Sequence, residues 1–132
     1  MFKAVLDTNI LVSALLSPAG APARVFDHVL NGDVILCFDS KIILEYREVL
    51  ARPKFNFDPG RIEVVLDFIL KTGISIVPKP LSSYDFIDKD DQVFFEVAIS
   101  TQGYLITGNL KHFPQSSNVV TAAEFLQLIK VQ

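Results

Sequence analysis

Short apolar runs alternate along this chain with stretches of helical periodicity, and this alternation constrains the fold more than any other feature. Predicted strands cover residues 3–6, 34–38, 74–77, 104–107 and 119–120. Predicted helices cover residues 9–16, 21–31, 40–51, 61–71 and 91–101, and a capping box at 121–124 opens a last helix. Residues 52–60 and 78–89 are expected to be irregular. The alternation predicts an α/β sandwich with a mainly parallel sheet.

The length and composition set the class of protein. The 132 residues fit one domain, which we expect to span residues 1–132. No apolar stretch approaches the ~20 residues of a membrane helix, and Asp7 interrupts the first apolar stretch before it resembles a signal peptide. The lone cysteine, Cys37, lies in an apolar run, so we interpret it as a buried side chain rather than a nucleophile. A chain without disulfides is expected in the reducing cytoplasm.

Polar residues follow several of the predicted strands. Asp7 comes directly after the first strand, Asp39 after the second, and Asn109 two residues after the strand that ends at Thr107. In parallel α/β sheets, ligands bind beyond the carboxyl ends of the strands, at a topological switch point. Asp7 is therefore a candidate functional acid, with a turn or cap residue as the alternative. Asp39 is interpreted as a helix cap.

Glu45 lies on the apolar face of its predicted helix. It stands three residues after Ile42 and four before Val49, which belong to the apolar stripe, whereas Glu48 lies off that stripe. A carboxylate on a buried face is costly unless it is paired or bound to a metal ion. A salt bridge to a lysine or arginine, or a solvated edge of the stripe, is the alternative to a functional role.

Asp91 repeats this pattern, because apolar residues stand three, four and seven residues after it. The alternative is that an acid suits the first turn of a helix, where the macrodipole stabilises it. Asp88 and Asp90 lie close by, and crowded carboxylates raise one another's pKa unless a cation neutralises them. Most such acidic runs are solvated loops.

A parallel α/β fold can bring Asp7, Glu45 and Asp91 to one edge of its sheet. Ligands that offer only oxygen suit Mg²⁺ or Mn²⁺, and such an ion can activate water and stabilise charge on a phosphoryl group. The combination predicts a metal-dependent nuclease. The net charge of −3 gives no general attraction to nucleic acid unless bound cations cover some of the acids.

Four motifs follow one another along nearly the whole chain. They are V-L-D-T-N-I-L-V-S-A at 5–14, S-K-I-I-L-E-Y-R-E-V-L at 40–50, D-K-D-D-Q-V-F-F-E-V-A at 88–98 and Y-L-I-T-G-N-L-K-H-F at 104–113. In this order they resemble the PIN domains, many of which are toxin components of bacterial and archaeal toxin–antitoxin pairs. The resemblance implies a three-layer α/β/α sandwich with a mainly parallel sheet of about five strands. It also implies a divalent-metal-dependent ribonuclease.

By position in these motifs, the resemblance implies that Asp7, Glu45 and Asp91 bind Mg²⁺ or Mn²⁺ and take part in catalysis. Asn109 occupies a fourth catalytic position that is often Asp in the family. An amide there can still orient a water molecule, but it removes a negative charge, so whether one or two metal ions bind stays open.

The resemblance further implies RNA as substrate, an antitoxin protein as partner and a homodimer. Residues expected to support the site are Asn9 and Thr107, with weaker candidates at Asp88 and Asp90. Candidate contacts to the RNA backbone are Lys41, Arg47, Lys89 and Lys111, with ordinary solvated surface charge as the alternative for each. His28 is expected to be structural or exposed, and His112 lies in a loop from which it can approach a substrate.

Two other kinds of protein fit part of the pattern. One is a catalytically inactive PIN-like scaffold or RNA-binding protein, which the Asn at position 109 favours. The other is a phosphoacceptor domain of the receiver or haloacid-hydrolase type, which also places Asp after its first strand. That second alternative needs a catalytic lysine, for which Lys111 is available, and it leaves Glu45 unexplained.

Overall fold

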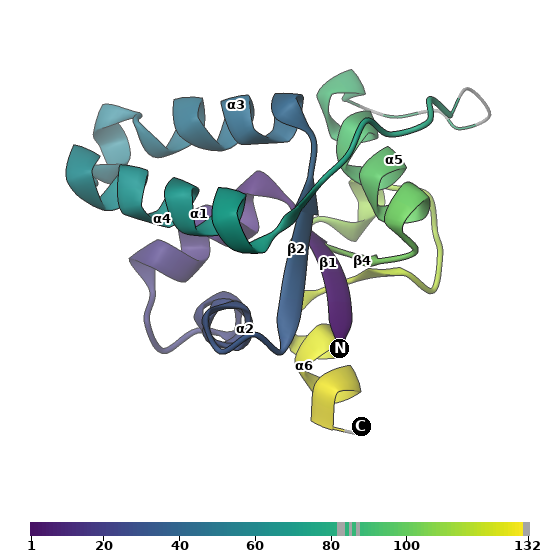
Figure 1. Cartoon of the computed structure of the whole chain (residues 1–132). Helices are drawn as coiled ribbons and strands as arrows, with labels where there is room; N and C mark the ends of the chain where they lie inside the picture. Colours follow the sequence, from purple (N-terminus) through teal and green to yellow (C-terminus); the bar gives the residue numbers. More distant parts are fainter. Residues whose placement is uncertain (82–83, 85, 87, 131–132) are drawn as a thin grey trace.

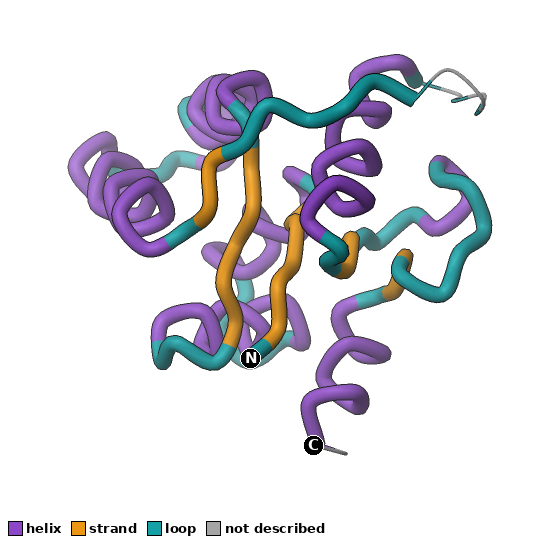
Figure 2. Tube along the Cα trace, turned by 45° about the vertical axis from the view of Figure 1, so that its right-hand side comes forward, coloured by secondary structure: helices purple, strands orange, loops and turns teal. Residues whose placement is uncertain are grey.

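Five parallel strands form the central sheet in the computed structural model, which describes residues 1–81, 84, 86 and 88–130. The strands are β1 (Phe2–Leu6), β2 (Val34–Phe38), β3 (Ile74–Ser75), β4 (Tyr104–Ile106) and β5 (Val119–Val120). Their order across the sheet is β3-β2-β1-β4-β5. Figure 2 shows the longer strands running side by side with helices around them. The predicted parallel α/β sheet is confirmed.

Helices cover both faces of the sheet. They are α1 (Thr8–Leu16), α2 (Ala21–Leu30), α3 (Ser40–Leu50), α4 (Pro59–Thr72), α5 (Gln92–Thr101) and α6 (Ala122–Lys130). Helix α5 packs on β1, β2 and β4, whereas α1 to α4 lie on the opposite side and α6 packs against α2 (Figure 1). This arrangement confirms the predicted three-layer α/β/α sandwich. Among the described residues, no helix combines the length and apolar character that crossing a membrane requires.

The order of the strands places a topological switch point at β1. The chain passes from β1 to β2 on one side and later returns to pair β4 with the other side of β1. Leu6 lies beside Ile106 in this parallel pair, and the Asp7 amide donates to the Ile106 carbonyl oxygen at 2.9 Å. The residues that follow these two strands, Asp7 and Thr107, therefore leave the sheet next to each other.

Tyr46 ties three elements together beneath this edge. Its ring is buried, and its hydroxyl donates to the carbonyl oxygen of Leu6, the last residue of β1, at 2.5 Å. Its ring also lies 6.4 Å from the ring of Phe94 on α5. Burial raises the pKa of the phenol well above its usual value, so this hydroxyl remains a donor. Tyr46 thus joins the end of β1, the middle of α3 and the start of α5.

Several boundaries differ from the sequence expectation. Residues 52–60 are not wholly irregular, because Pro53–Phe55 form a 3-10 turn and α4 begins at Pro59 with Asp58 as its cap. The strand expected at 74–77 ends at Ser75, and the one expected at 104–107 ends at Ile106. Residues 89–91 form a separate 3-10 turn, η2, so α5 begins at Gln92 rather than at residue 91.

Gly73 ends α4, as its position in the sequence predicts, but for a different reason from the usual helix-terminating glycine. Its backbone is extended rather than left-handed. A Cβ atom at this position would lie 2.6 Å from the carbonyl oxygen of Leu36 and 2.4 Å from the ring of Phe38. A glycine is therefore needed so that the chain can pass close to β2 before it enters β3.

Removing the Tyr46 hydroxyl tests its tethering role. In Tyr46→Phe the buried Leu6 carbonyl loses this donor, and we expect the free energy of unfolding to fall by about 1–3 kcal/mol. Urea denaturation followed by circular dichroism measures the change. Tyr104→Phe is the control, because the hydroxyl of this half-buried tyrosine makes no hydrogen bond within the described ranges. Equal stability of the two variants would contradict the assigned role.

Candidate active site

Asp7 begins the candidate site at the carboxyl end of β1. Its carboxylate accepts a hydrogen bond from the Thr107 hydroxyl at 2.8 Å, and Thr107 itself is fully buried. Burial raises the pKa of Asp7, although the hydrogen bond from Thr107 opposes that shift. The register of β1 and β4 brings these two residues together, so Thr107, which the sequence suggested as a supporting residue, contacts Asp7 directly.

Glu45 reaches the same edge from α3. Asp39 starts this helix, since its side chain accepts from the Ile42 amide at 2.9 Å, which confirms it as a cap. The half-buried Glu45 carboxylate accepts a hydrogen bond from the hydroxyl of Thr8, at the start of α1. Burial raises the pKa of Glu45, and the nearby charges of three aspartates raise it further. No lysine or arginine within the described residues forms an ion pair with Glu45.

Asp91 reaches the site from η2, at the start of α5. Its side chain is 16% exposed and lies 3.2 Å from Nδ1 of His112, on the 3-10 turn η3 (Leu110–His112) that follows β4. Burial, together with the charges of Asp7 and Asp88, raises the pKa of Asp91 to about 6. Of the three neighbouring acids Asp88, Asp90 and Asp91, only Asp91 is partly buried, as its helical phase predicted.

The three carboxylates are electrostatic neighbours. Burial is the main cause of the raised pKa values of Glu45 and Asp91, and the charge of Asp7 raises both further. In the part of the chain that the structure describes, no three His, Cys, Asp or Glu side chains already converge as one metal site. Binding one ion to all three carboxylates would therefore draw their side chains together. Their oxygen-only chemistry and mutual repulsion fit a hard divalent cation.

The remaining expected residues fall into different positions. Asn109 is exposed, and its backbone amide donates to the Thr107 hydroxyl oxygen at 3.0 Å. Asn9 is exposed on α1. Asp88 caps η2 by accepting from the Asp90 amide at 2.9 Å, while Asp90 is exposed. Within the described residues, the side chains of Asn9 and Asp88 form no hydrogen bond with the three carboxylates, although the charge of Asp88 raises the pKa of Glu45 and Asp91.

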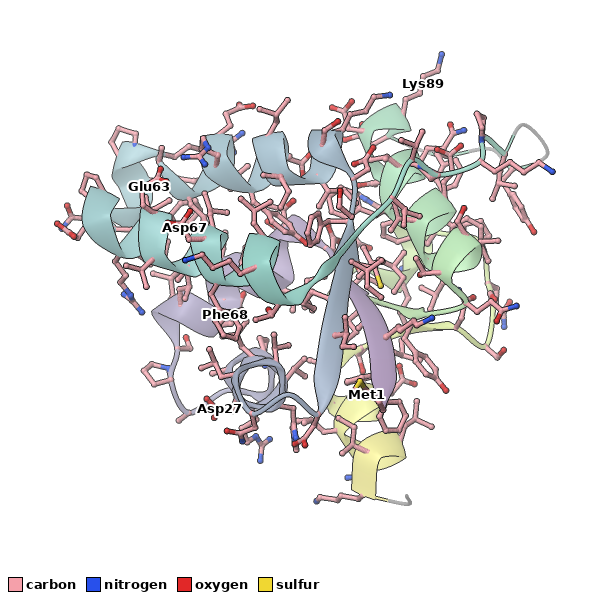
Figure 3. All side chains as sticks on the ribbon, viewed as in Figure 1. Met1, Asp27, Glu63, Asp67, Phe68 and Lys89 are labelled. Carbon is pink, nitrogen blue, oxygen red and sulfur yellow. The ribbon has the colours of Figure 1, made fainter. Side chains whose placement is uncertain are left out.

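The four basic residues that were candidates for RNA contacts lie in three different places. Lys41 and Lys89 line a cavity of about 620 Å³ that also includes Glu45 and Asp90. Lys89 points outward from η2, just before α5 (Figure 3). Arg47 instead pairs with Glu63 on α4. Lys111 lines a different, largely apolar cavity with Leu110 and Phe113.

Two polar residues near the site, Thr8 and Glu96, were not predicted from the sequence. Thr8, whose hydroxyl donates to Glu45, was not among the expected site residues, although its position directly after Asp7 in the D-T-N motif is a usable signal. Glu96 is buried on α5 and accepts from the Leu81 amide at 2.8 Å and from the Gln92 side chain at 3.0 Å. An acid within the apolar run of α5, four residues after Gln92, could have been found by the argument that identified Glu45.

Comparisons with known proteins agree with this architecture. A family model described as PIN domain matches residues 3–111. The uncharacterized protein MJ1680 of Methanocaldococcus jannaschii is 27% identical over 109 residues, which cover 81% of this chain and 70% of that protein. The fold is also similar to the crystal structure of VapBC2 from Rickettsia felis bound to a DNA fragment from their promoter. That match has a TM-score of 0.61 and 19% identity, and it covers 91% of this chain and 97% of that one.

The raised pKa of Asp91 predicts a gain of stability when its charge is removed. In EDTA at neutral pH, Asp91→Asn should unfold at a higher urea concentration than wild type, by about 1 kcal/mol after allowance for solvent screening. In the folded state the pKa of Asp91 is about 6, whereas in the unfolded state it returns to the ordinary value of 3.8. The gain should therefore shrink as the pH falls through this window and vanish below it. An unchanged difference at acidic pH would contradict this cause.

Proposed function

This chain belongs to the PIN domain family, and we propose that it is a divalent-metal-dependent ribonuclease. Membership in this family supports a nuclease. The observation that carries the proposal is the arrangement of three half-buried acids at the switch point of the sheet. Asp7, Glu45 and Asp91 come from three different elements, and all three have raised pKa values. Acids whose pKa values are raised by burial, and in Glu45 and Asp91 also by a neighbouring carboxylate, are typical of functional sites.

We propose that Asp7, Glu45 and Asp91 hold Mg²⁺ or Mn²⁺. When bound, such an ion would activate water at neutral pH and stabilise the charge that develops on a phosphoryl group. The residues of the chain supply orientation, since Thr107 donates to Asp7 and Thr8 donates to Glu45. Binding of a cation would also stabilise the ionised forms of these acids, which burial disfavours in all three and the charge of Asp7 disfavours further in Glu45 and Asp91.

Substrate contacts are proposed on both sides of this acid cluster. Asn109 is exposed after β4. Its backbone amide bonds to Thr107, so its side-chain amide is available to hydrogen-bond a phosphate oxygen or a water molecule. Lys41 and Lys89 line the cavity beside Glu45, so they are better candidates for contacts to the RNA backbone than Arg47, which is paired with Glu63.

The biological role is proposed to be that of the toxin component of a toxin–antitoxin pair. The structurally similar VapBC2 from Rickettsia felis, solved on a DNA fragment from their promoter, supports a comparable assembly. An antitoxin protein, a homodimer and a cytoplasmic location belong to the same proposal.

The inactive scaffold is the second candidate, favoured by the amide at position 109. The phosphoacceptor alternative is disfavoured, because the chain belongs to the PIN domain family and because a phosphoacceptor domain would give Glu45 no role.

Cleavage of RNA by the purified protein tests the enzymatic proposal. We expect cleavage with Mg²⁺ or Mn²⁺ that stops in EDTA and falls about 100-fold or more in Asp7→Asn, Glu45→Gln and Asp91→Asn. Product formation is measured on labelled RNA by gel electrophoresis. Asp27→Asn on α2 and Asp67→Asn on α4 are matched controls, because both residues are exposed and neither lines the cavity beside Glu45; Figure 3 labels both. These two variants should cleave as wild type does.

Three results would contradict the enzymatic proposal. Activity that survives in EDTA would exclude the metal, and a wild type that binds metal but cuts no RNA would favour the scaffold. A stable acyl-phosphate on Asp7 after treatment with acetyl phosphate would favour the phosphoacceptor alternative.

The toxin role is tested by induced expression in a bacterial host. We expect wild type to arrest growth and Asp7→Asn to permit it at an equal level of protein, because the arrest would require RNA cleavage. Growth curves and immunoblots measure the two quantities. Arrest by both proteins would show that toxicity does not come from this site.

A further inference from the structure

His112 is a polar residue beside the candidate site whose role in the proposed reaction is so far unassigned. It ends η3, the short turn after β4, and its Nδ1 lies 3.2 Å from a carboxylate oxygen of Asp91. The two residues are 21 positions apart, so the contact joins the loop after β4 to the start of α5. The imidazole is 38% exposed, whereas the Asp91 side chain is 16% exposed. One side of the ring therefore meets the acid while another faces solvent.

The segment that carries His112 is itself held at the site. The His112 amide donates to the Asn109 carbonyl oxygen at 3.1 Å, and the Asn109 amide donates to the Thr107 hydroxyl oxygen at 3.0 Å. Thr107 in turn donates to Asp7. Phe113, directly after the histidine, is buried. Residues 107–112 thus connect two of the three carboxylates through one short stretch of backbone.

We propose that His112 is a positioning residue that holds the Asp91 carboxylate in the orientation needed to bind the divalent cation. This inference rests on the proposed function. Because a carboxylate only accepts, the contact requires a proton on Nδ1, which is present in one of the two neutral tautomers and in the imidazolium ion, so the orientation does not need a charged ring. Carboxylates that bind metal ions are commonly oriented by a second hydrogen bond of this kind, and loss of that bond weakens metal binding.

A second histidine in the chain shows what an ordinary surface pair looks like. Nδ1 of His28 lies 2.8 Å from a carboxylate oxygen of Asp33, but only five residues separate them and Asp33 is 54% exposed. Exposed pairs of this kind contribute little. The pair of His112 and Asp91 differs because it fixes a mostly buried acid from a distant segment. The chain therefore contains its own matched control.

Binding of Mn²⁺ to the full chain, measured by isothermal titration calorimetry at one fixed pH, tests the inference without reference to cleavage. We expect His112→Ala to weaken Mn²⁺ binding by about tenfold, and His28→Ala to leave it unchanged. In His112→Asn the amide nitrogen can take the place of Nδ1, so affinity should return to within about threefold of wild type. The unfolding midpoint of each variant shows whether it is folded.

The outcomes separate the inference from the proposed function. If wild type binds Mn²⁺ and a folded His112→Ala binds it equally well, the positioning role is wrong and the metal-dependent function stands. If wild type binds no Mn²⁺, the proposed function is wrong and this inference falls with it. If His112→Ala does not fold, His112→Asn is compared with His112→Gln, whose amide lies one carbon further out. Equal affinity of those two variants would overturn the inference.

Discussion

The hydrogen bond from Tyr46 to the Leu6 carbonyl oxygen is the interaction on which the candidate site depends. Asp7 follows Leu6 directly, and Glu45 precedes Tyr46, so the bond fixes the two acids relative to each other. Contact between the rings of Tyr46 and Phe94 extends the same support to α5, which Asp91 immediately precedes. A buried hydroxyl bonded to a buried carbonyl is costly to break, because either partner would be left unsatisfied. The segments that carry the acids are therefore held close together, although the charge of Asp7 disfavours ionisation of the other two.

The topology supplies the second constraint. Because β1 and β4 are adjacent and parallel, the chain that leaves β4 must pass beside Asp7. Thr107 makes that contact first, and the following turn returns to Asp91 through His112. One connection thus serves two acids that lie far apart in the sequence. This is a physical reason for the site to lie at the switch point, where neighbouring connections diverge and leave room between them.

The sequence predicted the sheet, the three layers and the family, because strand and helix periodicities are local and the motifs cover most of the chain. It also predicted that Glu45 and Asp91 would be partly buried, since helical phase depends only on nearby residues. It could not predict the bond between Thr8 and Glu45 or the one between His112 and Asp91, because those pairs depend on how α1 packs on α3 and where the loop after β4 turns. The short β3 was misjudged because pairing with β2, not propensity, sets its length.

Each acid of the candidate site accepts a hydrogen bond from a neighbouring element: Asp7 from Thr107, Glu45 from Thr8, and Asp91 from His112. One such bond satisfies part of an ionised carboxylate, which can accept about four. Burial of these incompletely satisfied charges raises the pKa values of all three acids. The fold therefore orients the acids without neutralising them. Without a cation, this arrangement of acids destabilises the folded state. A cation that binds only the folded state would raise its free energy of unfolding, so metal binding and stability are coupled.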